Sequence, residues 1–258
     1  MSVTEVIALA AAAAAAGLVN AVAGGGTLIT FPALLAFGTP AIIANATNTL
    51  ALVFGTAGSV YAYREPIKAV RPWLKRFVPV SLLGGLLGGI LLTRTDEKVF
   101  AKMVPFLLLF ATIVFVSQGA FRRFAGFADK SEEAAPHHHT VWAAVLFQFF
   151  VALYGGYFGA GIGSLMLASL GLLGLTHIHE MNGLKTVLSS LINFVAAAYF
   201  IFAGLIDWPK AGVMTIGALA GYFLGAHYSQ RIPQRRVRQI ITTIGFLISA
   251  ALFCKQFR

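Results

Sequence analysis

The sequence is poor in charged residues and nearly free of cysteine. Charged residues make up 11% of its 258 positions, whereas a soluble domain typically carries about 25%. The single cysteine, Cys254, excludes an intramolecular disulfide and a cysteine-based metal cluster. Hydrophobic residues reach 58% and the mean hydropathy is +0.82, so we predict a multi-span membrane protein whose surroundings are the lipid bilayer.

Acidic residues are scarcer than basic ones, with 9 Asp and Glu against 19 Lys and Arg. In a soluble protein the net charge of +10 would suggest a nucleic-acid partner. Here the basic residues gather in the loops 64–76 and 231–238, as cytoplasmic loops of membrane proteins do. We therefore expect no nucleic-acid partner, and we place these loops in the cytoplasm with both termini outside.

Signatures of catalysis are missing from the sequence. It contains no recognisable set of nucleophile, base and orienting residue, and no phosphate-binding loop. Two histidine groups, 137–139 and the pair His177 and His179, could suggest a metal site, but one helix cannot direct residues two apart at a single ion. We predict that the protein is not an enzyme, uses no ATP and holds no metal or cofactor.

Apolar stretches recur along the whole chain. They cover residues 4–22, 27–37, 42–62, 73–93, 98–119, 141–160, 163–175, 180–204, 210–229 and 236–254. A spanning helix needs about 20 residues, so the second and seventh stretches are too short unless they are half-helices or re-entrant segments. The long polar interval 120–140 reads as a linker between the halves 1–119 and 141–258.

The two halves align with each other without gaps. Gly24 meets Gly161, Asn45 meets Asn182, Thr49 meets Thr186 and Arg94 meets Arg231. Each half holds an odd number of segments, so the two copies should cross the bilayer in opposite directions. The predicted fold is therefore an all-α polytopic membrane protein of two inverted repeats of transmembrane helices, each with a short broken or re-entrant segment, as in secondary transporters.

Glycines interrupt both halves directly before the short stretches, in "AGGGTLITFP" and "FGAGIGSLM". Broken backbone is tolerated at membrane depth where it lines a cavity. Helices that begin at Thr27 and Ser164 would direct free amides and a positive dipole end toward an anion. For "GGLLGG" (84–89) and "GYFLG" (221–225) we expect close helix packing instead of a site.

Polar residues at helical spacing follow each break. Asn45, Asn48 and Thr49 share a face in the first half, as Asn182, Lys185 and Thr186 do in the second. These stripes could hold helices together, and Lys185 could extend to the membrane surface; the alternative is a binding site. The predicted substrate site comprises Gly24, Gly25, Gly26, Thr27, Asn45, Asn48, Thr49, Gly161, Gly163, Ser164, Asn182, Lys185 and Thr186.

The glycine-rich "GGGTLITFPALLAFG" followed by "ANATNT", repeated weakly in the second half, resembles the TauE/SafE family of sulfite and organosulfur anion exporters. The likeness covers nearly the whole chain. It falls on Gly24–Gly26 and Pro32 in the first copy and on Gly159, Gly161 and Gly163 in the second, where Ser169 aligns with Pro32. The resemblance implies a multi-pass protein of the plasma membrane, the inner membrane in bacteria.

The predicted function is secondary transport that exports a small sulfur-containing oxyanion: sulfite, a sulfonate or a sulfoacetate-like anion. A coupling ion, H⁺ or Na⁺, or the membrane potential would drive it. The alternative is a passive, channel-like pore for small anions or neutral solutes, which half-helices broken by glycine also build.

Overall fold

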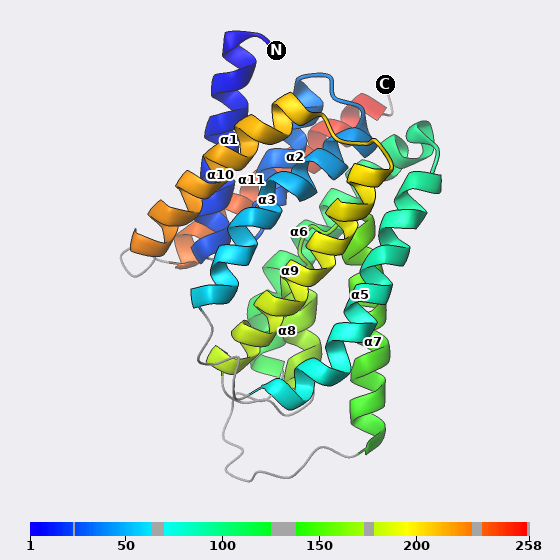
Figure 1. Ribbon diagram of the computed structural model, residues 1–258. Coiled ribbons are helices and arrows are strands. Elements are labelled where there is room, and N and C mark those ends of the chain that lie inside the picture. Colours follow the sequence, from blue (N-terminus) through cyan, green and yellow to red (C-terminus); the bar gives the residue numbers. More distant parts are fainter. Residues whose placement is uncertain (23, 63–69, 125–137, 173–177, 229–233, 257–258) are drawn as a thin grey trace.

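The computed structural model describes residues 1–22, 24–62, 70–124, 138–172, 178–228 and 234–256. Every element in these ranges is an α-helix (Figure 1). The helices are α1 (Val3–Val22), α2 (Thr27–Ala36), α3 (Ala41–Ala62), α5 (Arg71–Arg94), α6 (Glu97–Phe124), α7 (His138–Tyr157), α8 (Ile162–Leu172), α9 (Ile178–Phe202), α10 (Trp208–Tyr228) and α11 (Gln234–Gln256). His137 and His177 lie outside the described residues.

Helix length separates two kinds of segment. Within the described residues, five helices are long and apolar enough to cross a membrane, at Val3–Ala21, Arg71–Arg94, Glu97–Ser117, Glu180–Phe202 and Arg236–Gln256. In contrast, α2 has 10 residues and α8 has 11. At about 1.5 Å per residue these two reach about half of a hydrocarbon core that is roughly 30 Å thick. The predicted all-α membrane class, with two short segments, is confirmed.

The two halves of the chain enter the bundle from opposite ends. Both termini lie at one end of the molecule, and α7 begins at the other (Figure 1). In the first half, α1 runs away from the terminal end and α2 returns toward it. In the second half, α8 runs back toward the end where α7 begins (Figure 1). Each short helix thus runs back toward the end of the molecule at which the long helix before it begins.

Helix partners are exchanged between the halves. Helix α1 packs along α10, whereas its counterpart α7 packs along α5, the counterpart of α10. Counterparts also pack on each other, α3 on α9 and α6 on α11. A two-fold relation between inverted repeats would produce this exchange. It supports the inverted repeat, which stays a prediction together with the boundaries 1–119 and 141–258.

Glycines allow these helix pairs to approach closely. A Cβ at Gly221 would overlap the Ala14 carbonyl of α1, and a Cβ at Gly88 would overlap the Leu153 carbonyl of α7. Substitution at either position would therefore separate the helices. The packing role expected for the two glycine-rich runs in α5 and α10 is confirmed.

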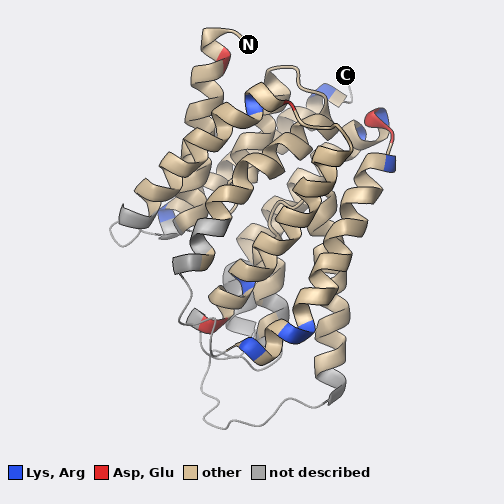
Figure 2. Cartoon of the chain, in the orientation of Figure 1, with Lys and Arg blue, Asp and Glu red and all other residues tan. Residues whose placement is uncertain are grey.

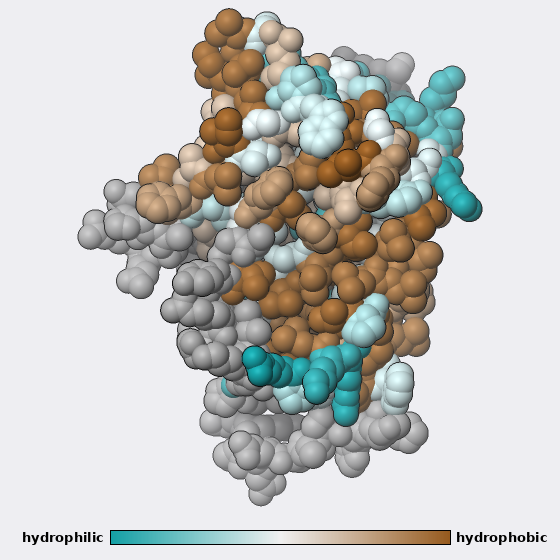
Figure 3. All heavy atoms as spheres, in the orientation of Figure 1, coloured by the Kyte–Doolittle hydropathy of each residue, from teal (hydrophilic) through white to brown (hydrophobic). Residues whose placement is uncertain are grey.

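The surface has the character of a membrane protein. Large apolar side chains face outward, among them Phe202, which is 89% exposed. In Figure 3 apolar residues cover the middle of the visible face, with hydrophilic residues at its lower edge. Basic residues Arg71, Lys75 and Arg76 are exposed at the start of α5, the end opposite both termini (Figure 2). The cytoplasmic placement of this end remains a prediction, and positions 64–69 and 231–233 lie outside the described part.

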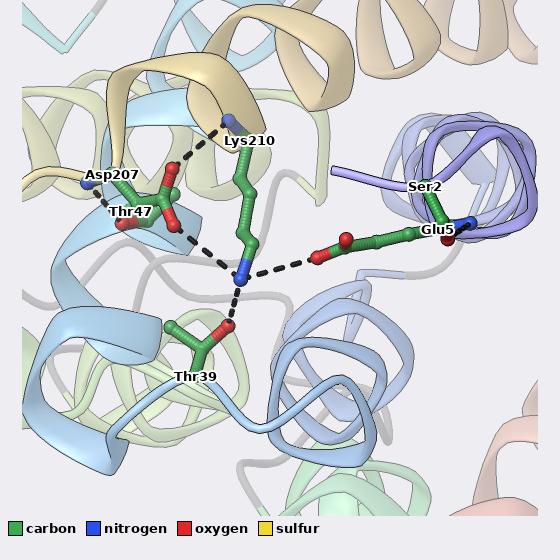
Figure 4. A network of polar contacts seen from close by, with 6 residues as sticks. All are labelled: Ser2, Glu5, Thr39, Thr47, Asp207 and Lys210. Atoms are coloured by element: carbon green, nitrogen blue, oxygen red, sulfur yellow. Dashed lines mark hydrogen bonds and ion pairs between the residues drawn. The ribbon is translucent and has the colours of Figure 1, made fainter.

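A polar network joins the halves at the terminal end. The Lys210 ammonium contacts Glu5 Oε1 at 3.2 Å and Asp207 Oδ2 at 3.4 Å (Figure 4). It also donates to Thr39 Oγ1 at 2.8 Å, and Thr47 Oγ1 accepts the Asp207 N–H at 3.0 Å. These bonds connect the start of α1, the loop after α2 and the start of α10. They place the end of α2 beside the start of α1.

Candidate functional site

Both breaks depend on backbone that favours glycine. The φ angles are +82° at Gly24 and +92° at Gly25 in the first break, and +79° at both Gly159 and Gly161 in the second. Residues with a Cβ lose about 1–2 kcal/mol in this left-handed region. The turns themselves therefore require glycine at these four positions, whereas Gly26 has an ordinary φ of −56°.

The first break is held by its own neighbours. The Gly24 N–H donates to the Val19 carbonyl at 3.0 Å, and the Gly26 N–H donates to Asn20 Oδ1 at 2.7 Å. Gly26 then precedes α2, and its carbonyl accepts the Ile29 N–H at 2.9 Å. Helix α2 begins at Thr27, as predicted, and the Asn20 side chain closes the turn before it.

The second break differs from its prediction. The Tyr154 hydroxyl donates to the Ala160 carbonyl at 2.8 Å and fixes the turn. Helix α8 begins at Ile162, earlier than Ser164, and the Ser164 N–H donates to the Gly161 carbonyl at 3.0 Å. The Ser164 amide is thus engaged within the helix. No backbone acceptor is found for the Gly163 amide among the described residues.

A cavity of about 140 Å³ lies where the two breaks face each other. Helices α1, α3, α6, α9 and α10 complete its wall. Its lining residues are Asn20, Gly24, Gly25, Thr27, Leu52, Thr56, Phe115, Gly159, Gly161, Ile162, Gly163, Ser164, Lys185, Thr186, Ser189, Asn193 and Tyr222. Residues far apart in the two halves, predicted as one site, therefore meet around one cavity.

Lys185 gives this cavity its charge. The residue is half-buried on α9, and its Cδ lies 3.3 Å from the position that a Cβ at Gly163 would take. Neither Asp nor Glu is among the described residues that line the cavity. The lining thus combines one cation with hydroxyl and amide groups, a set suited to oxygen atoms that carry negative charge.

Comparison with known proteins places this geometry in a family. The family model described as sulfite exporter TauE/SafE matches residues 9–252. The chain belongs to the TauE/SafE family. A probable membrane transporter protein of Haemophilus influenzae is 31% identical over 245 residues, covering 93% of this chain and 91% of its own length.

Two further relatives of this TauE/SafE protein carry similar names. The probable membrane transporter protein ORF9 of a Sinorhizobium species is 30% identical over 93% of this chain and 88% of its own length. The probable membrane transporter protein YfcA of Escherichia coli K12 is 25% identical over 92% of this chain and 85% of its own length. No solved structure matches the chain. The protein is a multi-pass membrane transporter.

Of the predicted site residues, Gly24, Gly25, Thr27, Gly161, Gly163, Ser164, Lys185 and Thr186 line the cavity of this TauE/SafE protein, whereas Gly26, Asn45, Asn48, Thr49 and Asn182 do not. The buried Asn48 side chain accepts the Thr30 hydroxyl of α2 instead. Asn45 Nδ2 donates to the Tyr157 carbonyl at the end of α7, at 3.0 Å, and Thr49 Oγ1 donates to the Asn45 carbonyl at 2.8 Å. Much of the first polar stripe thus joins helices.

Sequence reasoning passed over Asn20 and Tyr222 as lining residues. Asn20 carried a signal, since it is a polar residue in an apolar run shortly before the first break. Tyr222 carried none, because "GYFLG" is explained by close helix packing. Ser189 and Asn193 continue the Lys185 stripe at helical spacing and also line the cavity.

Proposed function

We propose that the protein is a secondary transporter of the plasma membrane that exports a small sulfur-containing oxyanion, with sulfite and short sulfonates as candidate substrates. In bacteria this membrane is the inner membrane, and H⁺ or Na⁺ would be the coupling ion. The proposal is carried by one observation: Lys185 and both glycine breaks line the same cavity. The family name supplies the sulfur chemistry.

The charge of the lining favours an anion. Lys185 is the cation of this lining, and an ammonium forms charge-assisted hydrogen bonds to oxyanions. The start of α8 adds the Gly163 amide and a helix dipole of about +0.5 charge at its N-terminus. The start of α2 at Thr27 adds a second dipole from the other side of the cavity.

The volume of the cavity limits the size of the ligand. A cavity of about 150 Å³ accommodates benzene in an engineered protein, and the cavity here is about 140 Å³. The substrate should therefore have only a few non-hydrogen atoms. Sulfite and sulfonates of one or two carbons meet this limit, whereas nucleotides and peptides exceed it.

Flux measurements in proteoliposomes test the proposal. We expect saturable uptake of radiolabelled sulfite that is accelerated by unlabelled sulfite or methanesulfonate on the opposite side. Choline, a cation of similar size, should not accelerate it. Flux that rises linearly with concentration, together with single-channel currents, would instead establish a passive pore. Absence of any flux of these anions would contradict the substrate class.

A further inference from the structure

Tyr222 lines the cavity and carries a buried hydroxyl without a hydrogen-bond partner among the described residues. The residue lines the cavity and is only 8% exposed. Its Oη has no hydrogen-bond partner among the residues that the structure describes. Buried polar groups nearly always have a partner, because losing water without replacing its hydrogen bond is unfavourable. An unpaired hydroxyl on a residue that lines a cavity is a candidate to bind a ligand there.

The position of this hydroxyl is set by helix packing. The Tyr222 ring lies on α3 at Gly55, where a Cβ would overlap Cε2 of the ring. On the α1 side, the Tyr222 backbone nitrogen lies 2.8 Å from the position of a Cβ at Gly17. Glycine on both neighbours thus lets α10 seat the ring against the bundle. The hydroxyl is held in place before any ligand binds.

Asn20 is the polar neighbour of this hydroxyl. The two side chains interact, but no hydrogen bond of normal geometry joins them. Asn20 Oδ1 also accepts the Gly26 N–H at 2.7 Å, the bond that closes the first break. In this geometry the Tyr222 O–H has no acceptor among the described residues.

The other half of the protein packs its equivalent helices without a hydroxyl. In the alignment of the halves, Gly85 corresponds to Tyr222 and Ile192 to Gly55. A Cβ at Gly85 would lie 3.2 Å from Ile192 Cα, so the small and large residues have exchanged places. An aliphatic side chain suffices to fill this contact. Packing alone therefore does not require the tyrosine.

We propose that the Tyr222 hydroxyl donates a hydrogen bond to an oxygen of the bound oxyanion and helps determine which anions bind. This inference rests on the proposed function. Lys185 neutralises the anion from α9, and Tyr222 provides a neutral donor from α10. A ligand with several acceptor oxygens, such as a sulfonate or sulfite, can use both donors at once.

The variant Tyr222→Phe tests the inference, because it keeps the ring and removes only the hydroxyl. We expect purified Tyr222→Phe to bind sulfite and methanesulfonate about three- to tenfold more weakly. The ligand-free variant should melt at the same temperature as the parent or higher, since a buried unpaired group is gone. If the hydroxyl only stabilises the fold, Tyr222→Phe will melt at a lower temperature than the parent and bind both anions with unchanged affinity. That result would refute the inference.

Tyr199→Phe is the matched control. The Tyr199 hydroxyl lies 3.3 Å from Thr93 Oγ1, and Tyr199 is not part of the described lining. Its loss should leave the affinity for both anions unchanged. If Tyr222→Phe binds both anions as tightly as the parent does while Lys185→Met binds them more weakly, the role of Tyr222 is refuted and the proposed function stands. If the parent binds neither anion, the proposed function fails and this inference fails with it.

Discussion

Replacing Lys185 by methionine tests the electrostatic basis of the site. Methionine keeps an unbranched side chain over Gly163, where Lys185 Cδ lies 3.3 Å from the position that a Cβ would take. The change removes a charge-assisted hydrogen bond to the anion, worth roughly 1.5–3 kcal/mol. At about 1.4 kcal/mol per factor of ten, affinity for sulfite should fall about 10- to 150-fold.

Stability and binding are measured separately in Lys185→Met. Lys185 also interacts with other groups of the protein, and removing one partner of a buried polar contact lowers stability, so the loss of affinity is judged on the folded variant. The assay is a titration of purified protein with sulfite, followed by the rise in melting temperature and repeated by equilibrium binding. Lys102→Met is the control, because this variant loses the same charge at an exposed position of α6 that does not line the cavity. Equal affinity of Lys185→Met and parent would refute the reasoning.

Three further changes test the backbone and the orientation. Gly161→Ala forces a Cβ onto a residue at φ +79°, so the melting temperature should fall by the equivalent of about 1–2 kcal/mol. Glu97→Ala removes the carboxylate that accepts the first two amides of α3 and should cost about 1–2 kcal/mol, whereas Lys98→Ala should cost little. A single cysteine at Lys75, with Cys254 replaced by serine, should react with an impermeant reagent in inside-out vesicles only. Labelling of this cysteine in intact cells would show that the orientation is the reverse of the predicted one.

Helix positions could be predicted closely from the sequence. The stretch 27–37 became α2 at Thr27–Ala36, and 42–62 became α3 at Ala41–Ala62. Gly26 and Gly38 flank the first stretch and Pro40 stands just before the second, and the backbone geometry of glycine and proline interrupts a helix. The linker was shorter than predicted, since α6 continues to Phe124 and α7 begins at His138. Gly126 and Pro136 stand two residues outside these helix ends, but the prediction followed the apolar pattern, which stops before the helices do.

The facing of polar side chains was harder to predict. Helical spacing places Asn45, Asn48 and Thr49 near one another, but it does not say whether that face meets a cavity or another helix. The rotation of α3 about its axis decides this, and packing against α9, α10 and α2 sets the rotation. Asn48 consequently meets Thr30, and Asn45 meets the Tyr157 carbonyl. Such long-range contacts leave no periodic signal in a single sequence.

Differences between the aligned halves are more informative about the proposed site than their similarities. The shared glycines produce the same turns and the same close helix contacts in both halves, which any ligand-free scaffold of this shape would need. Lys185 aligns with Asn48, and Tyr222 aligns with Gly85. In each pair the second-half residue lines the cavity, while its first-half partner does not. A small oxyanion needs a charge and directed donors, so the proposed recognition groups lie at the positions where the repeat has diverged.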